Sequence, residues 1–452
     1  MWQLNHDVTS VICSMLDQCS ILQFALTCHA AHDILIPAFL YAHIDLVECT
    51  GRRISLFCWN VTISSRYGNV TRSFRCSFRP PTYAFDASQI ADALRNMRNL
   101  RTLDLTFGNA MRNGRHITAA FSELPALRNL SLRQISEKEL GGLGDSFPLR
   151  ALSVTLSDSH YDITPESAVG RVLLASRGTL TKLTLSSEMK WRFNASNQSS
   201  RSSPAKADDL IWPHVYTMWI DITETASHLD FPHTFPSVRF LASPMPHEWA
   251  KHPSNRSFIS NLELASGTWE VMQVALGAGA RLRRVVTTPD VLLPAYDLSK
   301  YLDPCHLRSL HIELGRELNC LEQLATAAPN LVSLCVDFEA SGSHDLKVAL
   351  NALLSSLSPL PLEFLFLRWR RPWTGRSAYR KSMETIQNDF PSLIPRSLTS
   401  LRSVGFRTSE MEGKWHKIFD VDEGASRFAV TSAYEWADTL AYYERGWMTS
   451  SL

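Results

Sequence analysis

The amino-acid sequence predicts an α/β protein in which a short helical module precedes a long array of parallel strands and covering helices. Two patterns predict this fold: apolar residues at helical spacing in the first 46 positions, and the motif apolar-x-x-apolar-x-apolar, which recurs from about residue 90 onward. The composition is compatible with it, because 45% hydrophobic residues can build a core. Gly and Pro, 19 and 22 of 452 residues, are too few for a collagen-like or mostly disordered chain.

In the first 46 residues the sequence predicts three apolar segments followed by a strand. One helix face is predicted by residues at positions i, i+3, i+4, i+7 and i+8, namely Val8, Val11, Ile12, Met15 and Leu16. Asn5 is expected to cap this helix, and Ser20 with Gln23 matches a capping box that would start a second one. A third apolar segment, 34–41, leads into 43–46, whose alternation predicts a strand.

The recurring motif has the length of a leucine-rich repeat. Its first apolar positions are Leu100, Leu127, Leu149, Leu180, Val215, Val238, Ile259, Leu282, Leu307, Leu331, Leu362 and Leu401. Spacings from 215 to 331 are 23, 21, 23, 25 and 24 residues, within the 20–29 typical of such repeats. The other spacings are longer or less regular, and the asparagine usual in these repeats is absent, so an irregular solenoid is expected.

Helical segments between the motifs are expected to cover the convex side of the strands. They are 90–97, 168–174, 269–276 and 346–357. The x-apolar-x-apolar part of each motif has a period of two, so its apolar residues share one face of a strand. Each repeat can then bury that face against its neighbours. A different α/β packing that is merely rich in leucine is the alternative.

These patterns divide the chain into four parts. They are a helical module at 1–46, a connecting segment and start of the solenoid at 47–89, degenerate repeats at 90–408 and a C-terminal cap at 409–452. A polar, Ser-rich loop at 194–209 interrupts the repeats.

The order of residues in the first module resembles the F-box, in the form found at the start of many fungal F-box proteins. The matching residues are Leu4, Val8, Val11, Ile12, Leu16, Ile21, Leu22, Ala25, Leu26 and Cys28, followed by Pro37 and Leu40-Tyr41-Ala42-His43-Ile44. The resemblance covers roughly a tenth of the chain. With the repeats that follow, the chain is similar to F-box proteins that carry leucine-rich repeats.

The resemblance implies a non-enzymatic substrate receptor of a cullin-RING (SCF-type) ubiquitin ligase. In such a complex the F-box binds a Skp-type adaptor, and through it a cullin, while the repeats hold a protein substrate of unknown identity. The adaptor-binding residues that it implies are Leu4, Asn5, Val8, Val11, Ile12, Leu16, Ile21, Leu22 and Cys28. The location implied is the cytoplasm, the nucleus or both. The scattered, odd-numbered set of nine cysteines agrees with a reducing compartment.

Two positions depart from the family pattern. Asn5 stands where the family usually has proline, and His29-Ala30-Ala31 follows Cys28 where a basic residue and an aromatic are usual. The alternative function is therefore a leucine-rich-repeat interaction scaffold whose F-box has decayed and which has no ligase role.

The sequence predicts no catalytic residue, no cofactor and no metal site. His247-Glu248-x-x-x-His252 has histidines five apart, whereas a zinc-protease helix needs four, so a loop is expected there. Cys28 could bind zinc only with further ligands, and no Cys-x-x-Cys pair accompanies it, so it is expected to pack in the core. The net charge of +1 argues against a nucleic-acid binder, and no run reaches the ~18 apolar residues of a membrane span.

Strand positions between the apolar residues are expected to line the concave face, where a protein substrate would bind. The candidates for substrate binding are Trp219, Arg284, His311, Phe364, Phe366 and Arg368. The three aromatic side chains are the strongest of these, because large rings that face solvent are costly unless they bind a partner or are covered.

Overall fold

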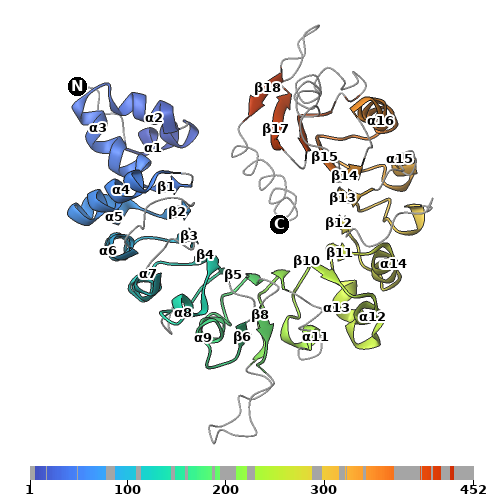
Figure 1. Cartoon of the computed structure of the whole chain (residues 1–452), viewed down its shortest axis with the longest axis horizontal. Coiled ribbons are helices and arrows are strands. Elements are labelled where there is room, and N and C mark those ends of the chain that lie inside the picture. The colour runs from blue at the N-terminus through green and yellow to red at the C-terminus, as the bar shows by residue number, and fades with distance from the viewer. Residues whose placement is uncertain are drawn as a thin grey trace, which may run out of the picture. The chain divides into compact units, whose positions relative to one another are not determined.

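A computed structural model of the chain is shown in Figure 1. It describes residues 6–16, 18–47, 49–77, 87–107, 114–143, 148–157, 161–185, 189–193, 210–220, 230–287, 298–314, 321, 323–339, 343–370, 398, 400–408, 411–418 and 428–431. The chain forms two compact units, residues 1–238 and 239–452. Within the described residues, no helix has both the length and the apolar character needed to cross a membrane.

The first unit begins with helices and continues as alternating strands and helices. Its helical elements are α1 (His6–Met15), α2 (Gln18–Ala25), α3 (His29–Leu35), η1 (Ile36–Leu40), α4 (Gly51–Ile63), α5 (Ser65–Val70), α6 (Ala87–Asn96), α7 (Gly114–Ala120), η2 (Phe121–Glu123), α8 (Glu137–Leu140), α9 (Ala168–Ala175) and α11 (Phe231–Thr234). Its strands are β1 (His43–Leu46), β2 (Ser73–Ser77), β3 (Thr102–Thr106), β4 (Asn129–Ile135), β5 (Ala151–Leu156), β6 (Tyr161–Ile163), β7 (Lys182–Leu185), β8 (Met189–Trp191) and β9 (Thr217–Trp219).

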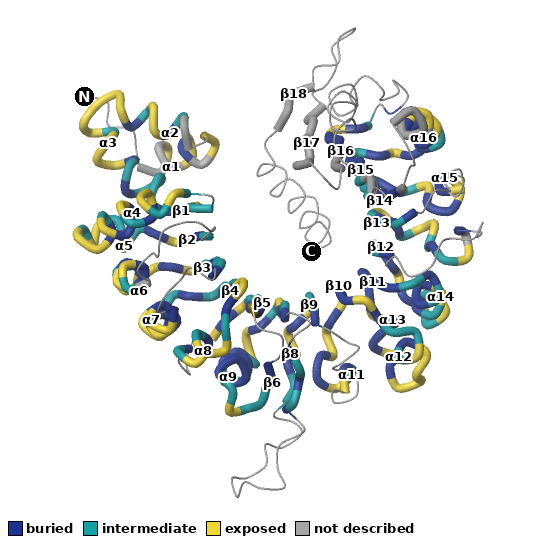
Figure 2. Tube along the Cα trace, viewed as in Figure 1, coloured by how far each residue is buried: buried dark blue, intermediate teal, exposed yellow. Residues whose placement is uncertain are grey.

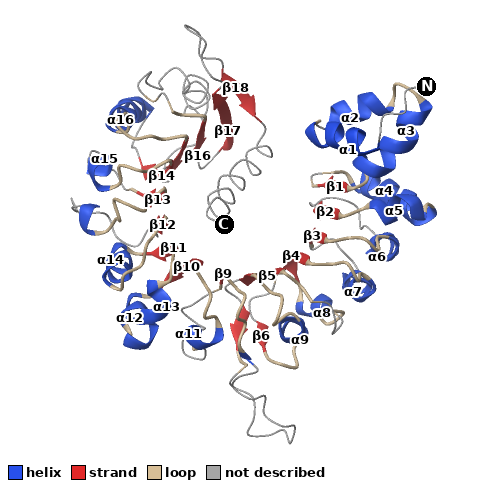
Figure 3. Cartoon of the chain, turned by 180° about the vertical axis from the view of Figure 1, so that it is seen from behind, coloured by secondary structure: helices blue, strands red, loops and turns tan. Residues whose placement is uncertain are grey.

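Seven of these strands pair in parallel, in the order β1-β2-β3-β4-β5-β7-β9, as counted over the described residues. β6 and β8 form a separate two-stranded parallel sheet. The described helices α4 to α9 lie on one face of the larger sheet (Figures 1 and 3). This is the strand-and-helix alternation that the recurring motif predicts.

The second unit repeats the same plan. Its strands are β10 (Phe240–Met245), β11 (Leu264–Gly267), β12 (Arg284–Thr287), β13 (Ser309–Glu313), β14 (Ser333–Glu339), β15 (Phe364–Arg370), β16 (Ser403–Thr408), β17 (Met411–Ile418) and β18 (Phe428–Thr431). Its helices are α12 (His247–Lys251), η4 (Pro253–Asn255), α13 (Arg256–Ser260), α14 (Trp269–Gly277), η5 (Leu298–Lys300), α15 (Leu324–Ala327) and α16 (Ser343–Ser356). β10 to β16 pair in parallel in chain order, whereas β17 and β18 continue the sheet antiparallel.

The apolar residues of the motif form the core, as predicted. Leu103 of β3 lies level with Leu130 of β4, and Leu105 lies level with Leu132. All four side chains are at most 2% exposed. The predicted helical segments are also confirmed, as α6, α9, α14 and α16.

One backbone carbonyl per repeat holds consecutive strands together. The Arg101 carbonyl oxygen accepts the amides of both Arg128 and Asn129, each at 2.9 Å. Six such carbonyls occur in the described part of each unit, with N···O distances of 2.7–3.3 Å. We call each series the carbonyl row. The oxygens are those of Ala42, Arg72, Arg101, Arg128, Arg150 and Thr181 in the first unit, and of Arg239, Glu263, Arg283, Arg308, Val332 and Glu363 in the second.

Three local predictions are wrong. Ser20 does not start a helix, because α2 already begins at Gln18. Residues 247–251 form the short helix α12 rather than a loop, because the turn fits between Pro246 and Pro253. The repeat placed at Ile259 is displaced by three residues, because Ala265 rather than Leu262 lies level with Val285.

Several predictions fall outside the described residues. They concern the N-cap Asn5, the loop 194–209 and the part of the C-terminal cap from 432 onward. The antiparallel strands β17 and β18 lie in the segment predicted to be a cap, where the sequence suggested no strand.

The cysteines differ sharply in burial. None of the seven whose side chains are described forms a disulfide. Burial raises the pKa of Cys58 to about 12 and raises that of Cys76 well above its ordinary value, because a desolvated thiolate is unfavourable. Cys28 and Cys305 are exposed.

Thiol alkylation of the folded protein is therefore expected to be selective. At pH 8 roughly one Cys58 thiol in ten thousand is ionised, so iodoacetamide should leave Cys58 and Cys76 intact while it modifies Cys28 and Cys305. Peptide mass spectrometry after a short reaction measures this. The same reaction in denaturant is the control, and modification of Cys58 at the rate of Cys28 in the native protein would contradict the described packing.

Candidate functional site

The N-terminal helices expose a large number of apolar side chains. We define the N-terminal apolar surface as Val8, Val11, Ile12, Met15, Leu16, Leu22 and Leu26, all of which are exposed. In α1 the exposed fraction reaches 60% at Val11 and 81% at Met15. Figure 2 shows exposed residues along α2 and α3 as well. Several apolar side chains exposed to solvent on neighbouring helices usually mark an interaction site.

The opposite sides of these helices hold the module together. A small core is formed by Cys13, Ile21, Ala25 and Leu35, with Phe24 and Phe39 packed against it. α1 thus presents its apolar stripe outward and only Cys13, among its described side chains, inward. This arrangement leaves the stripe available to a partner.

Not all of the predicted adaptor-binding residues lie on the N-terminal apolar surface. Val8, Val11, Ile12, Leu16 and Leu22 belong to the exposed surface. Ile21 is buried, so it supports the surface and does not line it.

Cys28 and the first two predicted residues differ from these. The expectation that Cys28 packs in the core is wrong. It is exposed, and its sulfur caps α3 by accepting the amide of Ala31 at 3.4 Å. Leu4 and Asn5 lie outside the described residues.

Sequence reasoning missed a second exposed apolar stripe, on α4. Leu56, Trp59 and Ile63 are about 60% exposed and occupy positions i, i+3 and i+7 of one helix face. The other face of α4 carries Phe57 and Cys58 into the core. The sequence does carry a signal for this stripe, because apolar residues occur on both faces of the helix. The signal goes unused when 47–89 is taken as a connecting segment.

On the strand face of the first unit, charged side chains pair with one another across strands. Arg75 on β2 lies between Asp45 on β1 and Asp104 on β3, at 3.5 and 3.4 Å. Arg133 on β4 also reaches Asp104, at 2.7 Å. Trp219, the substrate-binding candidate in this unit, is half-buried on β9.

In the second unit the strand register brings several predicted residues together. His311 on β13, Cys335 on β14 and Phe366 on β15 lie level, and Asp337 lies level with Arg368. The guanidinium carbon of Arg368 lies 5.8 Å from the centre of the Phe366 ring, within cation–π range. Arg284, at the start of β12, is level with Ser309.

The expectation that Phe364 and Phe366 face solvent is wrong. Both lie at the expected strand positions, but they are only 1% and 4% exposed. Neighbouring groups cover the rings, and the Arg368 side chain over Phe366 is one of them. Exposure depends on what packs above a strand, which a strand position alone does not determine.

The buried carboxylate of Asp337 is the centre of this group. Its Oδ2 accepts a hydrogen bond from Arg368 Nη1 at 3.1 Å, and its Oδ1 lies 3.5 Å from His311 Nε2. The Asp337 side chain is fully buried, while those of His311 and Arg368 are about one-third exposed. An aspartate in this position needs such cationic or donor partners, because an isolated buried charge is strongly unfavourable.

Comparison of the chain with protein-family models gives no match. Comparison with curated proteins gives no match either.

Proposed function

We propose that this protein is a substrate receptor whose N-terminal helices bind a Skp-type adaptor of a cullin-RING ubiquitin ligase, and whose strands and repeats hold a protein substrate. In this role it has no catalytic activity of its own. The proposal rests on the F-box-like order of residues in the first module.

The observation that carries the proposal is the exposure of the N-terminal apolar surface. Five of the nine residues that the resemblance implies for adaptor binding are exposed apolar side chains, three on α1, one directly after it and one on α2. A helix pair with an apolar face of this kind suits a contact in which helices pack into an apolar groove of a partner. Burial of that face would also remove the cost of its exposure to water.

The second candidate function is a scaffold that binds a partner without any ligase. The departures from the family pattern favour it, namely Asn5 and the segment His29-Ala30-Ala31. In the structure Ala31 packs against the small core of the module. An alanine offers neither a charge nor a ring to a partner at that position.

Adaptor binding distinguishes the two functions. We expect the intact protein to bind a purified Skp-type adaptor, and Val11→Asp to weaken that binding at least about tenfold, because a charged group would be buried at the contact. Biolayer interferometry with immobilised adaptor measures both affinities.

Val348→Asp is the matched control. Val348 lies on α16 and is 57% exposed, against 60% for Val11, so the two substitutions have the same chemistry at similar exposure. It should bind like the unmodified protein. If the unmodified protein does not bind the adaptor, the ligase proposal fails and the scaffold function remains.

A further inference from the structure

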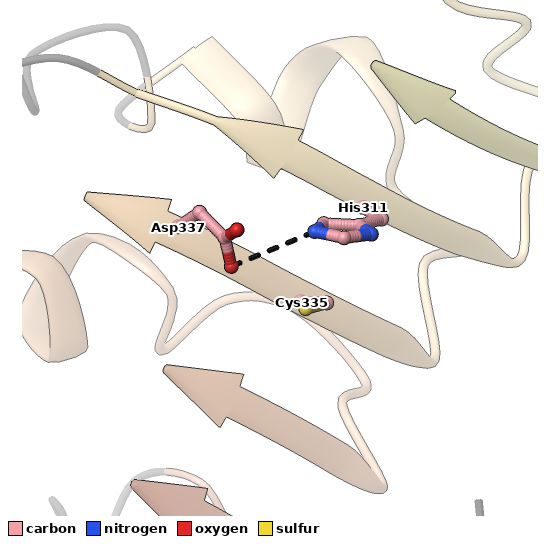
Figure 4. Close-up of side chains that lie close together, drawn as sticks. All are labelled: His311, Cys335 and Asp337. Atoms are coloured by element: carbon pink, nitrogen blue, oxygen red, sulfur yellow. Dashed lines mark ion pairs between the residues drawn. The ribbon is translucent and has the colours of Figure 1, made fainter. Parts of the chain in front are cut away.

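Three potential metal ligands meet on the strand face of the second unit. His311 of β13 is level with Cys335 of the adjacent parallel strand, and Asp337 follows two residues later on the same side of β14. One ligand atom from each residue lies within 4.8 Å of the other two (Figure 4). A histidine nitrogen, a cysteine sulfur and a carboxylate oxygen therefore converge on one point.

The spacing of these atoms suits a shared metal ion. Ligands bind Zn²⁺ at about 2.0–2.3 Å, and in a tetrahedron neighbouring ligand atoms are separated by about 1.6 times that length, or roughly 3.3–3.8 Å. His311 Nε2 and Asp337 Oδ1 are already 3.5 Å apart. The Cys335 sulfur lies within 4.8 Å of a ligand atom of each of the other two residues, so it is at most about 1 Å beyond the longest of these separations.

The hydrogen bond to Asp337 is of the kind that holds a metal-binding carboxylate in place. Arg368 donates to Oδ2, which fixes the carboxylate and turns Oδ1 towards His311. Ligating carboxylates are commonly held in this way by a second hydrogen bond. The charges of the Asp337 carboxylate and the Arg368 guanidinium cancel, and a bound zinc ion would displace the proton of the Cys335 thiol, as metal binding does for ligating cysteines in general.

We propose that His311, Cys335 and Asp337 bind one zinc ion. Sulfur and imidazole nitrogen exclude Mg²⁺ and Ca²⁺, which prefer oxygen ligands, and three protein ligands are the number that tetrahedral zinc uses when its fourth position is open. His311 and Cys335 are partly exposed, so that position is accessible to water or to a side chain of a bound protein. The site is independent of adaptor binding by the first unit.

Cobalt substitution tests the proposal on the full-length protein. After treatment with a chelator, titration with Co²⁺ should give one equivalent of a species with a thiolate-to-cobalt charge-transfer band and the visible bands of tetrahedral cobalt. Added Zn²⁺ should abolish both. Cys335→Ser and His311→Ala should each weaken binding by about a hundredfold or more, since even removal of a supporting group costs 10–100-fold.

A neighbouring set of the same residue types provides the control. Asp303, Cys305 and His306 lie before β13, where His306 Nδ1 pairs with Asp303 Oδ2 at 2.8 Å and Cys305 is exposed. Cys305→Ser should bind cobalt like the unmodified protein. Circular dichroism of each variant without metal checks folding. Absence of the charge-transfer band in the unmodified protein, or its persistence in folded Cys335→Ser, would overturn the assignment.

Discussion

Replacement of Trp212 by alanine is expected to lower the free energy of unfolding of the first unit by about 3–5 kcal/mol. The Trp212 side chain is fully buried, and its ring lies 5.4 Å from Trp191, 5.6 Å from Phe193 and 5.7 Å from Phe235, centre to centre. Its Nε1 donates a hydrogen bond to the Leu173 carbonyl oxygen at 3.0 Å. Alanine would leave a cavity among these rings and remove one of the two donors to that carbonyl, the other being the Ser176 amide at 3.2 Å. Urea unfolding followed by circular dichroism measures the loss.

Two further variants separate the cavity from the hydrogen bond. Trp212→Phe keeps one aromatic ring in the cluster but loses the donor and part of the packing, so a smaller loss of about 1–3 kcal/mol is expected. Trp59→Ala removes a tryptophan that is 63% exposed on α4 and should change stability by less than about 0.5 kcal/mol. Equal effects of Trp212→Ala and Trp59→Ala would contradict the described burial.

Gly170→Ala is expected to destabilise the first unit by about 2–3 kcal/mol, although alanine normally stabilises a helix by about 0.5–1 kcal/mol relative to glycine. Gly170 lies in α9, and a Cβ atom there would collide with the Thr164 carbonyl oxygen and lie 2.9 Å from Ser167 Oγ. That hydroxyl caps the helix by accepting the Gly170 amide at 3.1 Å and donates to the same Thr164 carbonyl at 2.7 Å. The methyl group would therefore break the cap. Urea unfolding measures the change.

Gly178→Ala is the matched control for this substitution. Gly178 lies in the turn after α9, and a Cβ atom there would meet no neighbour within 4 Å. Its stability should be unchanged or slightly increased. A stabilising effect of Gly170→Ala would show that the Thr164 carbonyl does not approach α9 as closely as described.

The large parallel sheet and its covering helices could be predicted because leucine marks the buried positions of most repeats. The earliest repeats were missed where that marker is absent. In the repeat that contains β2, Phe74 and Cys76 lie level with Leu103 and Leu105 of β3, and Thr71, before β2, corresponds to Leu100, before β3. Thr71 is fully buried and donates its hydroxyl to the Tyr67 carbonyl oxygen at 3.0 Å, which satisfies a polar side chain at an apolar position. β11 was misplaced for a related reason, since its buried positions carry the small residues Ala265 and Gly267.

The two candidate sites were predictable to different degrees. The spacing of Val8, Val11 and Ile12 predicts one helix face, but whether that face points inward or outward depends on the packing of Cys13 and Leu35 below it. The group around Asp337 could have been found by alignment of two repeats. Superposition of Leu307 on Leu331 places His311 level with Cys335, 24 residues later. The burial of Asp337 and its contact with Arg368 could not be read in this way, because they depend on a third strand.

Because of the carbonyl row, the register between neighbouring strands does not depend on how many residues connect them. In the first unit, consecutive carbonyls of the row are separated by 29, 27, 22 and 31 residues from Arg72 to Thr181, and every step has the same pair of hydrogen bonds. Segments inserted between one strand and the next therefore enlarge only the connection, and the next strand is still aligned by the carbonyl before it. Such a framework can accumulate insertions during evolution at almost any connection, and so gain new surface loops without a change in its core.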